Sequence, residues 1–309
     1  MNISVVIPVY KAPKILPELI ARLDQTLTQI TKSFEIILVD DGCPWDSWAV
    51  IHDLTMKYTF LKGIKLSRNF GQHFAIAAGL DQVLGEWIIV MDCDLQDRPE
   101  DILLLHRIAV ENKWDIVIAA AKNRNLNLLK EFSSRIYKKM FNYFSNIDLE
   151  EGVGNFGIYN SKVIKSIQQM GDQIRVFPIL VKWVGFKRTT VNIHRDERKE
   201  GKSSYNYWSL FKLAFDIGLA FSDKILRICL SAGLLTILCA IIYSINIFCR
   251  YYNGIVTVPG YTSLLITVLL MSGFILTFMG ILGLYVSKMF QKIKDRPLYI
   301  VSKTTFKEN

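Results

Sequence analysis

Up to residue 119, short apolar runs alternate with stretches whose apolar positions recur at helical spacing. The runs lack a helical period, so they predict buried strands at 3–9, 35–39, 87–91 and 115–119, and residues 61–66 also look like a strand. The stretches between them predict helices at 13–30, 47–58, 72–84 and 102–110. Strands that alternate with helices indicate βαβ units and a mainly parallel sheet. We therefore predict an α/β fold for this part of the chain.

Two long, uncharged apolar segments follow at 228–248 and 261–286. Each is long enough for a helix to cross a bilayer core, which takes about 20 residues. The linker between them carries a single basic residue, Arg250. Basic residues flank the pair on both sides: Lys224, Arg227, Lys288, Lys292, Lys294 and Arg296. Because positive charge favours the cytoplasmic side, we expect both flanks in the cytoplasm and the linker outside.

These segments divide the chain into four parts. We expect a cytoplasmic α/β domain at 1–205, an amphipathic interfacial helix at 206–223, a two-helix transmembrane hairpin at 224–287 and a cytoplasmic tail at 288–309. The stretch 130–145 also predicts a basic amphipathic helix, which fits either an anionic membrane surface or an ordinary half-buried position.

Composition agrees with a membrane portion. The 309 residues are 51% hydrophobic, the net charge is +9 and the mean hydropathy is +0.25. The basic residues gather beside the apolar segments, where anionic lipid explains them better than nucleic acid does. The five cysteines form no CxxC or Cys/His cluster, so neither a disulfide framework nor a zinc site is indicated, and a reducing compartment is expected.

Two of the predicted strands end in carboxylates. Asp40 and Asp41 follow one strand, and Asp92 and Asp94, with Gln96 beyond them, follow another. Since open α/β sheets bind ligands at the carboxyl ends of their strands, both acidic ends are expected at one edge. Paired carboxylates there suit a hard divalent cation held against a diphosphate. The alternative is a solvated acidic turn that caps a helix. No GxGxxG follows the first strand and no GxxxxGK[ST] occurs, which excludes the usual dinucleotide cradle and P-loop.

The ordered motifs resemble those of membrane-bound family 2 glycosyltransferases of the polyprenyl-phosphate kind, relatives of dolichol-phosphate mannose synthase. They cover nearly the whole chain: VVIPVY (5–10), LVDDG (38–42), LSRNFGQH (66–73), VMDCDLQDRPE (90–100), GNFGIYNSKVI (154–164), RKEGKSSY (198–205) and RPLY (296–299). The resemblance implies a GT-A, Rossmann-like catalytic domain. It also implies an inverting transfer of one sugar from a nucleotide-sugar to a polyprenyl phosphate, with Mg²⁺ or Mn²⁺.

The resemblance also assigns residues by position. Those expected to bind the nucleotide-sugar are Pro8, Tyr10, Asp40, Asp41, Asp92, Cys93, Asp94 and Arg198. Asp92, Asp94 and Gln96 are expected to hold the metal. Arg198 and Lys202 lie in a loop that closes over the donor phosphates in relatives, and they join Asp92 and Asp94 as the expected catalytic residues. Cys93 stands where the family usually has alanine.

The chain departs from some relatives at the acceptor side. Asn155 stands where they have aspartate, and asparagine cannot act as a base. An acceptor phosphate, with a second pKa of about 6, is already largely ionised at pH 7 and needs no strong base. Ala121 lies near where relatives place an arginine, so Lys130 and Arg135, with Asn155, are the expected acceptor-binding residues. Lys122 and Arg124 are open alternatives.

The leading hypothesis is a polyprenyl-phosphate glycosyltransferase in the bacterial cytoplasmic membrane. It would use a UDP-sugar, accept undecaprenyl phosphate at the inner leaflet and form a homo-oligomer, as tetramer-forming relatives imply. One alternative keeps the fold and extends a lipid-linked oligosaccharide or glycan. Another is a carrier that flips lipid-linked sugars and has a nucleotide-sensing domain, although the two spans lack the midplane charge that transport usually needs.

Overall fold

The computed structural model describes residues 2–121, 153–170, 176–194, 196, 260–293 and 296–306, with scattered positions between 231 and 253. The chain divides into two compact units. The first contains Met1–Ser134, Ile147–Ser204 and Pro297–Asn309, and the second contains Arg135–Asn146 and Tyr205–Arg296. The expected catalytic residues that the structure describes all belong to the first unit.

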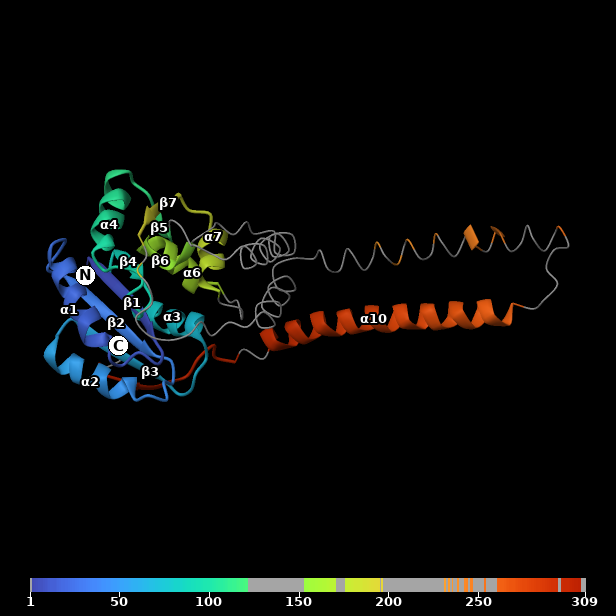
Figure 1. Ribbon diagram of the computed structural model, residues 1–309, viewed down its shortest axis with the longest axis horizontal. Helices are drawn as coiled ribbons and strands as arrows, with labels where there is room; N and C mark the ends of the chain where they lie inside the picture. Colours follow the sequence, from blue (N-terminus) through green and yellow to red (C-terminus); the bar gives the residue numbers. More distant parts are fainter. Residues whose placement is uncertain are drawn as a thin grey trace. The chain divides into compact units, whose positions relative to one another are not determined.

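Eight strands of the described residues form one sheet (Figure 1). Their order is β7 (Arg188–Ile193), β5 (Ile116–Ala121), β6 (Val153–Asn160), β4 (Trp87–Val90), β1 (Ile3–Val9), β2 (Phe34–Asp40), β3 (Leu61–Leu66) and β8 (Val301–Thr304). Strand β6 runs antiparallel to both of its neighbours, and β8 runs antiparallel to β3; the other neighbours are parallel. The predicted α/β class with a mainly parallel sheet is confirmed.

Helices cover both faces of this sheet (Figure 1). Helices α1 (Leu16–Thr28), α2 (Ser47–Lys57) and α4 (Asp101–Glu111) pack on one face. Helices α3 (Gln72–Leu80), α6 (Ser161–Gln168) and α7 (Phe177–Trp183) pack on the other. In β2, Ile36 and Leu38 join the core on the first face, whereas Ile37 and Val39 join the core on the second. Burial on both faces explains why β2 reads as a continuous apolar run.

The predicted strands are observed as β1 to β5, with ends that differ by at most two residues. The predicted helices are also present, but α3 ends at Leu80 instead of 84. After Leu80 the backbone leaves the helix and approaches Glu35 on β2. There the N–H of Leu84 donates to the buried Glu35 Oε1 at 2.8 Å, a contact that a continued helix would prevent.

The local pattern did not predict β6, α6, α7, β7 or β8. The last of these closes one edge of the sheet: Ser67 N donates to Ile300 O at 2.8 Å, and Tyr299 Oη donates to Asp81 Oδ2 at 2.6 Å. Thr305 Oγ1 accepts from Gly63 N at 2.8 Å. Residues near the end of the chain, assigned from sequence to a tail, therefore belong to the sheet unit.

The second unit contains α10 (Tyr261–Ile293), a helix of 33 residues. It continues beyond the predicted segment 261–286 and carries many exposed apolar side chains, such as Leu264, Ile275 and Leu282. Judged on the described residues alone, no helix is long and apolar enough to span a membrane. The predicted amphipathic stretches 130–145 and 206–223 lie outside the described residues, as does most of the predicted span 228–248.

Candidate active site

The carboxyl ends of three neighbouring strands bring the predicted site residues to one edge of the sheet. Strand β1 lies between β2 and β4, and the parallel registers pair Val9 with Asp40 and Val6 with Val90. Beyond the strand ends, Asp41 N donates to Val9 O at 3.0 Å and Met91 N donates to Val6 O at 3.2 Å. The acidic ends of β2 and β4 therefore meet at the same edge, as the sequence predicted.

Residues 92–97 after β4, the acidic turn, alternate between open and buried positions. Cys93, Leu95 and Asp97 are buried, whereas Asp92, Asp94 and Gln96 are partly exposed. Leu95 adopts a left-handed φ of 57° while its side chain stays 2% exposed. Such a backbone is unfavourable for leucine and persists because the buried side chain fixes the turn. The turn thus presents its three polar side chains on its partly exposed positions.

Two amide side chains orient Asp92. Gln72 Nε2, at the first turn of α3, donates to Asp92 Oδ1 at 2.7 Å. Asn155 Nδ2, on β6, donates to the same oxygen at 3.3 Å. Asn155 was expected to bind the acceptor, and in the structure it contacts Asp92, an expected metal ligand. Sequence reasoning missed Gln72, although it lies within the NFGQH stretch that carries the family resemblance.

Residues at the end of the acidic turn contact Asp196, which precedes the segment that contains Arg198. Gln96 N donates to Asp94 Oδ1 at 3.2 Å, and Gln96 O accepts from Asp196 N at 3.0 Å. Arg98 Nε donates to Asp196 Oδ2 at 2.7 Å, and its second nitrogen bonds to Oδ1. This bidentate pair anchors the chain just before the segment that contains Arg198. Arg198, Lys202, Lys130 and Arg135 themselves lie outside the described residues.

Asp41 has a structural task at the end of β2. Its Oδ1 accepts from Phe70 N at 2.7 Å, and its Oδ2 accepts from Gly71 N at 2.9 Å. Burial raises the pKa of Asp41, although these two hydrogen bonds oppose the shift. Gly42 next to it has a φ of 59°, and a Cβ there would lie 2.4 Å from the Arg68 carbonyl carbon. Glycine is therefore required where the two loops approach.

Asp40 is fully buried at the end of β2. Its Oδ1 accepts from Cys43 N at 2.8 Å, and its Oδ2 has no hydrogen-bond partner among the described residues. Burial raises the pKa of Asp40. Pro8, expected to bind the nucleotide-sugar, is likewise buried within β1.

Cys93 is a buried thiol behind the acidic turn. Burial raises the pKa of Cys93 to about 12, so the thiol stays protonated at neutral pH. Cys93 therefore fills space behind the turn and does not act as a nucleophile.

The acidic turn suits a hard cation. Among the described residues, no group of three or more His, Cys, Asp or Glu side chains gathers as a complete metal cage. Mg²⁺ needs no such cage, because it takes one or two carboxylates and completes its shell with water and phosphate oxygens. Asp92 and Asp94, on the open positions of one turn, fit this chemistry.

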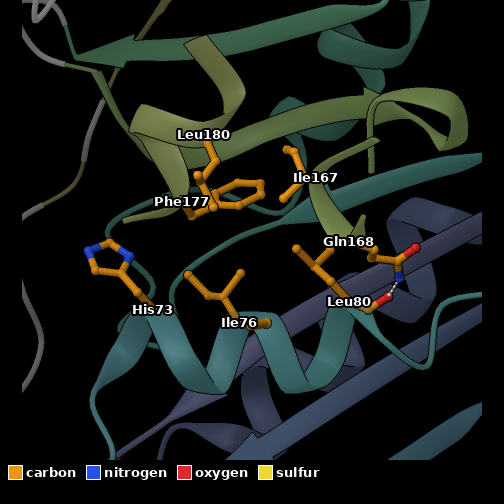
Figure 2. Close-up of a pocket in the computed structure, with 8 residues that line it drawn as sticks. His73, Ile76, Leu80, Ile167, Gln168, Phe177 and Leu180 are labelled. Atoms are coloured by element: carbon orange, nitrogen blue, oxygen red, sulfur yellow. Dashed lines mark hydrogen bonds between the residues drawn. The ribbon is translucent and has the colours of Figure 1, made fainter. Parts of the chain in front are cut away.

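A small apolar cavity lies beside the site, between α3, α6 and α7 (Figure 2). Its lining is formed by His73, Ile76, Ala77, Leu80, Ile167, Gln168, Phe177 and Leu180. The Nδ1 atom of His73 is buried without a hydrogen-bond partner among the described residues. Burial lowers the pKa of His73 to about 4.

We expect His73 to make stability depend on pH. The unfolded chain, with a pKa of about 6.5, binds the proton more readily than the fold. The contribution of neutral His73 to the free energy of unfolding is therefore fully present above the pKa of the unfolded chain. It is lost as pH falls toward about 4, the pKa in the fold. Allowing for the partial exposure of the residue, the loss between pH 7 and pH 5 is about 1 kcal/mol. Urea unfolding should show this loss in the parent and not in His73→Asn. His52→Gln, at an exposed position, is the control; equal losses in the parent and His73→Asn contradict the expectation.

Comparisons with known proteins identify the family of this chain. Residues 4–168 match the family model described as Glycosyl transferase family 2. An uncharacterized glycosyltransferase of Synechocystis sp. is 33% identical over 307 residues, which cover 98% of this chain and 95% of that protein. The Escherichia coli prophage bactoprenol glucosyl transferase homolog is 30% identical over 98% of this chain and 99% of its own length.

Two further similar proteins have descriptions that name an acceptor or a bound nucleotide-sugar. The undecaprenyl-phosphate 4-deoxy-4-formamido-L-arabinose transferase of Yersinia pestis is 30% identical over 98% of this chain and 93% of that protein. A crystal structure of residues 1–349 of Staphylococcus aureus TarS with UDP-GlcNAc is 17% identical, with a TM-score of 0.47, over 72% of this chain and 68% of that one.

Proposed function

Because this chain belongs to glycosyl transferase family 2, we propose that it transfers one sugar from a UDP-sugar to undecaprenyl phosphate. Membership makes it a glycosyltransferase of class EC 2.4. The observation that carries the choice of acceptor is a set of relatives, about 30% identical over nearly the whole chain, whose names specify bactoprenol or undecaprenyl phosphate.

In this proposal, Asp92 and Asp94, with Gln96, hold Mg²⁺ or Mn²⁺ against the donor diphosphate. When bound, the cation neutralises the charge that develops on the leaving nucleoside diphosphate. Gln72 and Asn155 keep Asp92 Oδ1 turned toward themselves, which orients the carboxylate. Arg198 and Lys202 follow the anchored Asp196 in sequence and add positive charge for the phosphates.

The acceptor phosphate attacks the anomeric carbon directly, and the configuration at that carbon inverts. A phosphate monoester is largely ionised at neutral pH, so the attack needs no general base. An asparagine at position 155, which cannot act as a base, is therefore compatible with the reaction. In this proposal Asn155 orients Asp92 through its hydrogen bond. Lys130 and Arg135 are proposed to bind the acceptor phosphate.

The acceptor is a membrane lipid, so we place the protein at the cytoplasmic face of the bacterial inner membrane. The uncharged segments 228–248 and 261–286 form the proposed hairpin, and both termini are cytoplasmic. The exposed apolar side chains of α10 support this placement. Within the described residues no helix qualifies as a membrane span. A homo-oligomer packed through the hairpins is part of the same proposal.

The test is a transfer assay on the full-length protein in detergent. It contains undecaprenyl phosphate, Mg²⁺ or Mn²⁺ and a panel of nucleotide-sugars, and lipid extracts are read by mass spectrometry. We expect a lipid heavier by one sugar, its loss with EDTA and its return with excess Mg²⁺. Donor binding without product, whichever donor is supplied, contradicts the proposed acceptor and favours extension of a lipid-linked glycan. Product that still forms in EDTA contradicts the proposed requirement for a divalent cation.

A further inference from the structure

A cation and two aromatic rings lie together at the edge of the sheet where the acidic turn is found. Lys11 Nζ lies 5.1 Å from the centroid of the Tyr10 ring and 5.7 Å from that of the Trp45 ring. Tyr10 is 40% exposed and Trp45 is 57% exposed. Large aromatic side chains are costly to leave in water, so an exposed pair beside a site indicates a surface for a ligand.

One buried thiol, that of Cys43, holds the backbone of this cluster. Lys11 N donates to Cys43 Sγ at 3.1 Å, and Trp45 N donates to the same sulfur at 3.4 Å. Lys11 itself has a left-handed φ of 57°, an unfavourable conformation for lysine that these contacts maintain. The backbone at Lys11 and Trp45 is therefore held in place before any ligand arrives.

The position of the cluster fits a nucleoside diphosphate. Since β1 lies between β2 and β4, Lys11 stands between the loop of Trp45 and the acidic turn. A flat base can stack on an indole ring, and an ammonium is a good partner for a diphosphate. An exposed cation–π contact is weak, so Lys11 can leave the rings when a doubly charged group is offered.

We propose that Trp45 and Lys11 bind the nucleoside diphosphate part of the donor. The base stacks on Trp45, and the Lys11 ammonium moves from the two rings to the diphosphate. This inference rests on the proposed function and adds two contacts from residues that the family motifs in this chain do not assign.

The test measures equilibrium binding of UDP and, in parallel, GDP to the full-length protein. Four variants are compared with the parent: Trp45→Leu, Trp45→Phe, Lys11→Met and Lys187→Met. The last is a matched control, because Lys187 Nζ lies 4.4 Å from the Trp114 ring centroid, a similar pair before β5. Tryptophan emission provides a second readout of base stacking.

We expect Trp45→Leu to weaken binding of the nucleotide about tenfold, and Trp45→Phe to restore most of it. Lys11→Met should weaken binding about tenfold and reduce its dependence on salt, whereas Trp45→Leu should leave the salt dependence unchanged. Nucleotide should quench emission in the parent and much less in Trp45→Phe. Lys187→Met should bind as the parent does.

Parent-like affinity in both Trp45→Leu and Lys11→Met overturns the inference while the proposed function stands. A parent that binds neither UDP nor GDP overturns both. A parent that binds nucleotide through Trp45 but transfers no sugar to undecaprenyl phosphate overturns only the proposed acceptor.

Discussion

Replacing Asp92 with asparagine is expected to reduce sugar transfer roughly 10²–10³-fold, the typical loss when one group that stabilises a transition state is removed. The change keeps the size of the side chain and an oxygen that can accept from Gln72 and Asn155, so the turn should stay folded. It removes the negative charge that would hold the cation. Initial rates over a range of Mg²⁺ concentrations measure the effect, and a higher Mg²⁺ requirement should accompany the lower rate.

The orienting amides should show a smaller effect of the same kind. Gln72→Leu leaves the carboxylate in place but removes its 2.7 Å hydrogen bond, and groups that orient a metal ligand typically contribute about 10–100-fold. Asp53→Asn, at an exposed position on α2, removes the same charge away from the site and should act like the parent. Full activity in Asp92→Asn would refute both the metal site and the role of the turn.

Replacing Glu35 with alanine is expected to destabilise the sheet unit by about 3 kcal/mol, the range for breaking a buried ion pair. The side chain is 1% exposed and accepts three hydrogen bonds: from Ser4 Oγ at 2.6 Å, Leu84 N at 2.8 Å and Lys62 Nζ at 2.7 Å. These contacts join β1, β2, β3 and the turn before β4. Removal leaves buried donors without an acceptor, and each such group is itself costly. The lysine is 26% exposed, which places the loss at the lower end of the range.

Chemical unfolding of the full chain in detergent, followed by tryptophan emission, measures this loss. Glu35→Gln should lose less, because its amide oxygen still accepts from Leu84 or Ser4 while only the charge is gone. Glu111→Ala, at an exposed position of α4, is the control and should change the free energy of unfolding by less than about 0.5 kcal/mol. A Glu35→Ala protein as stable as this control would contradict the expected role of the buried carboxylate.

The first half of the fold could be predicted because its information is local. Strands β1, β2, β4 and β5 are short apolar runs, and burial on both faces of β1 and β2 removes the polar alternation that would mark an exposed face. The acids that end β2 and β4 could be placed together without a structure, since parallel strands carry their carboxyl ends to one edge. The same rule does not say what each acid does: Asp41 binds the backbone of Phe70 and Gly71.

The sequence by itself determined the α/β class and the edge of the sheet at which the acidic ends of β2 and β4 meet, and it predicted Asp92 and Asp94 as the acidic centre of the site. Tertiary structure decided which residues surround them. Asn155 reaches Asp92 across 63 residues because β6 inserts antiparallel between β4 and β5, and Gln72 reaches it from α3. Strand β8 joins β3 from the end of the chain in the same way. Hydrophobic periodicity indicates which positions of one segment are buried or exposed to solvent. The contacts above depend on which segments pair with each other, and the local sequence pattern does not specify that pairing.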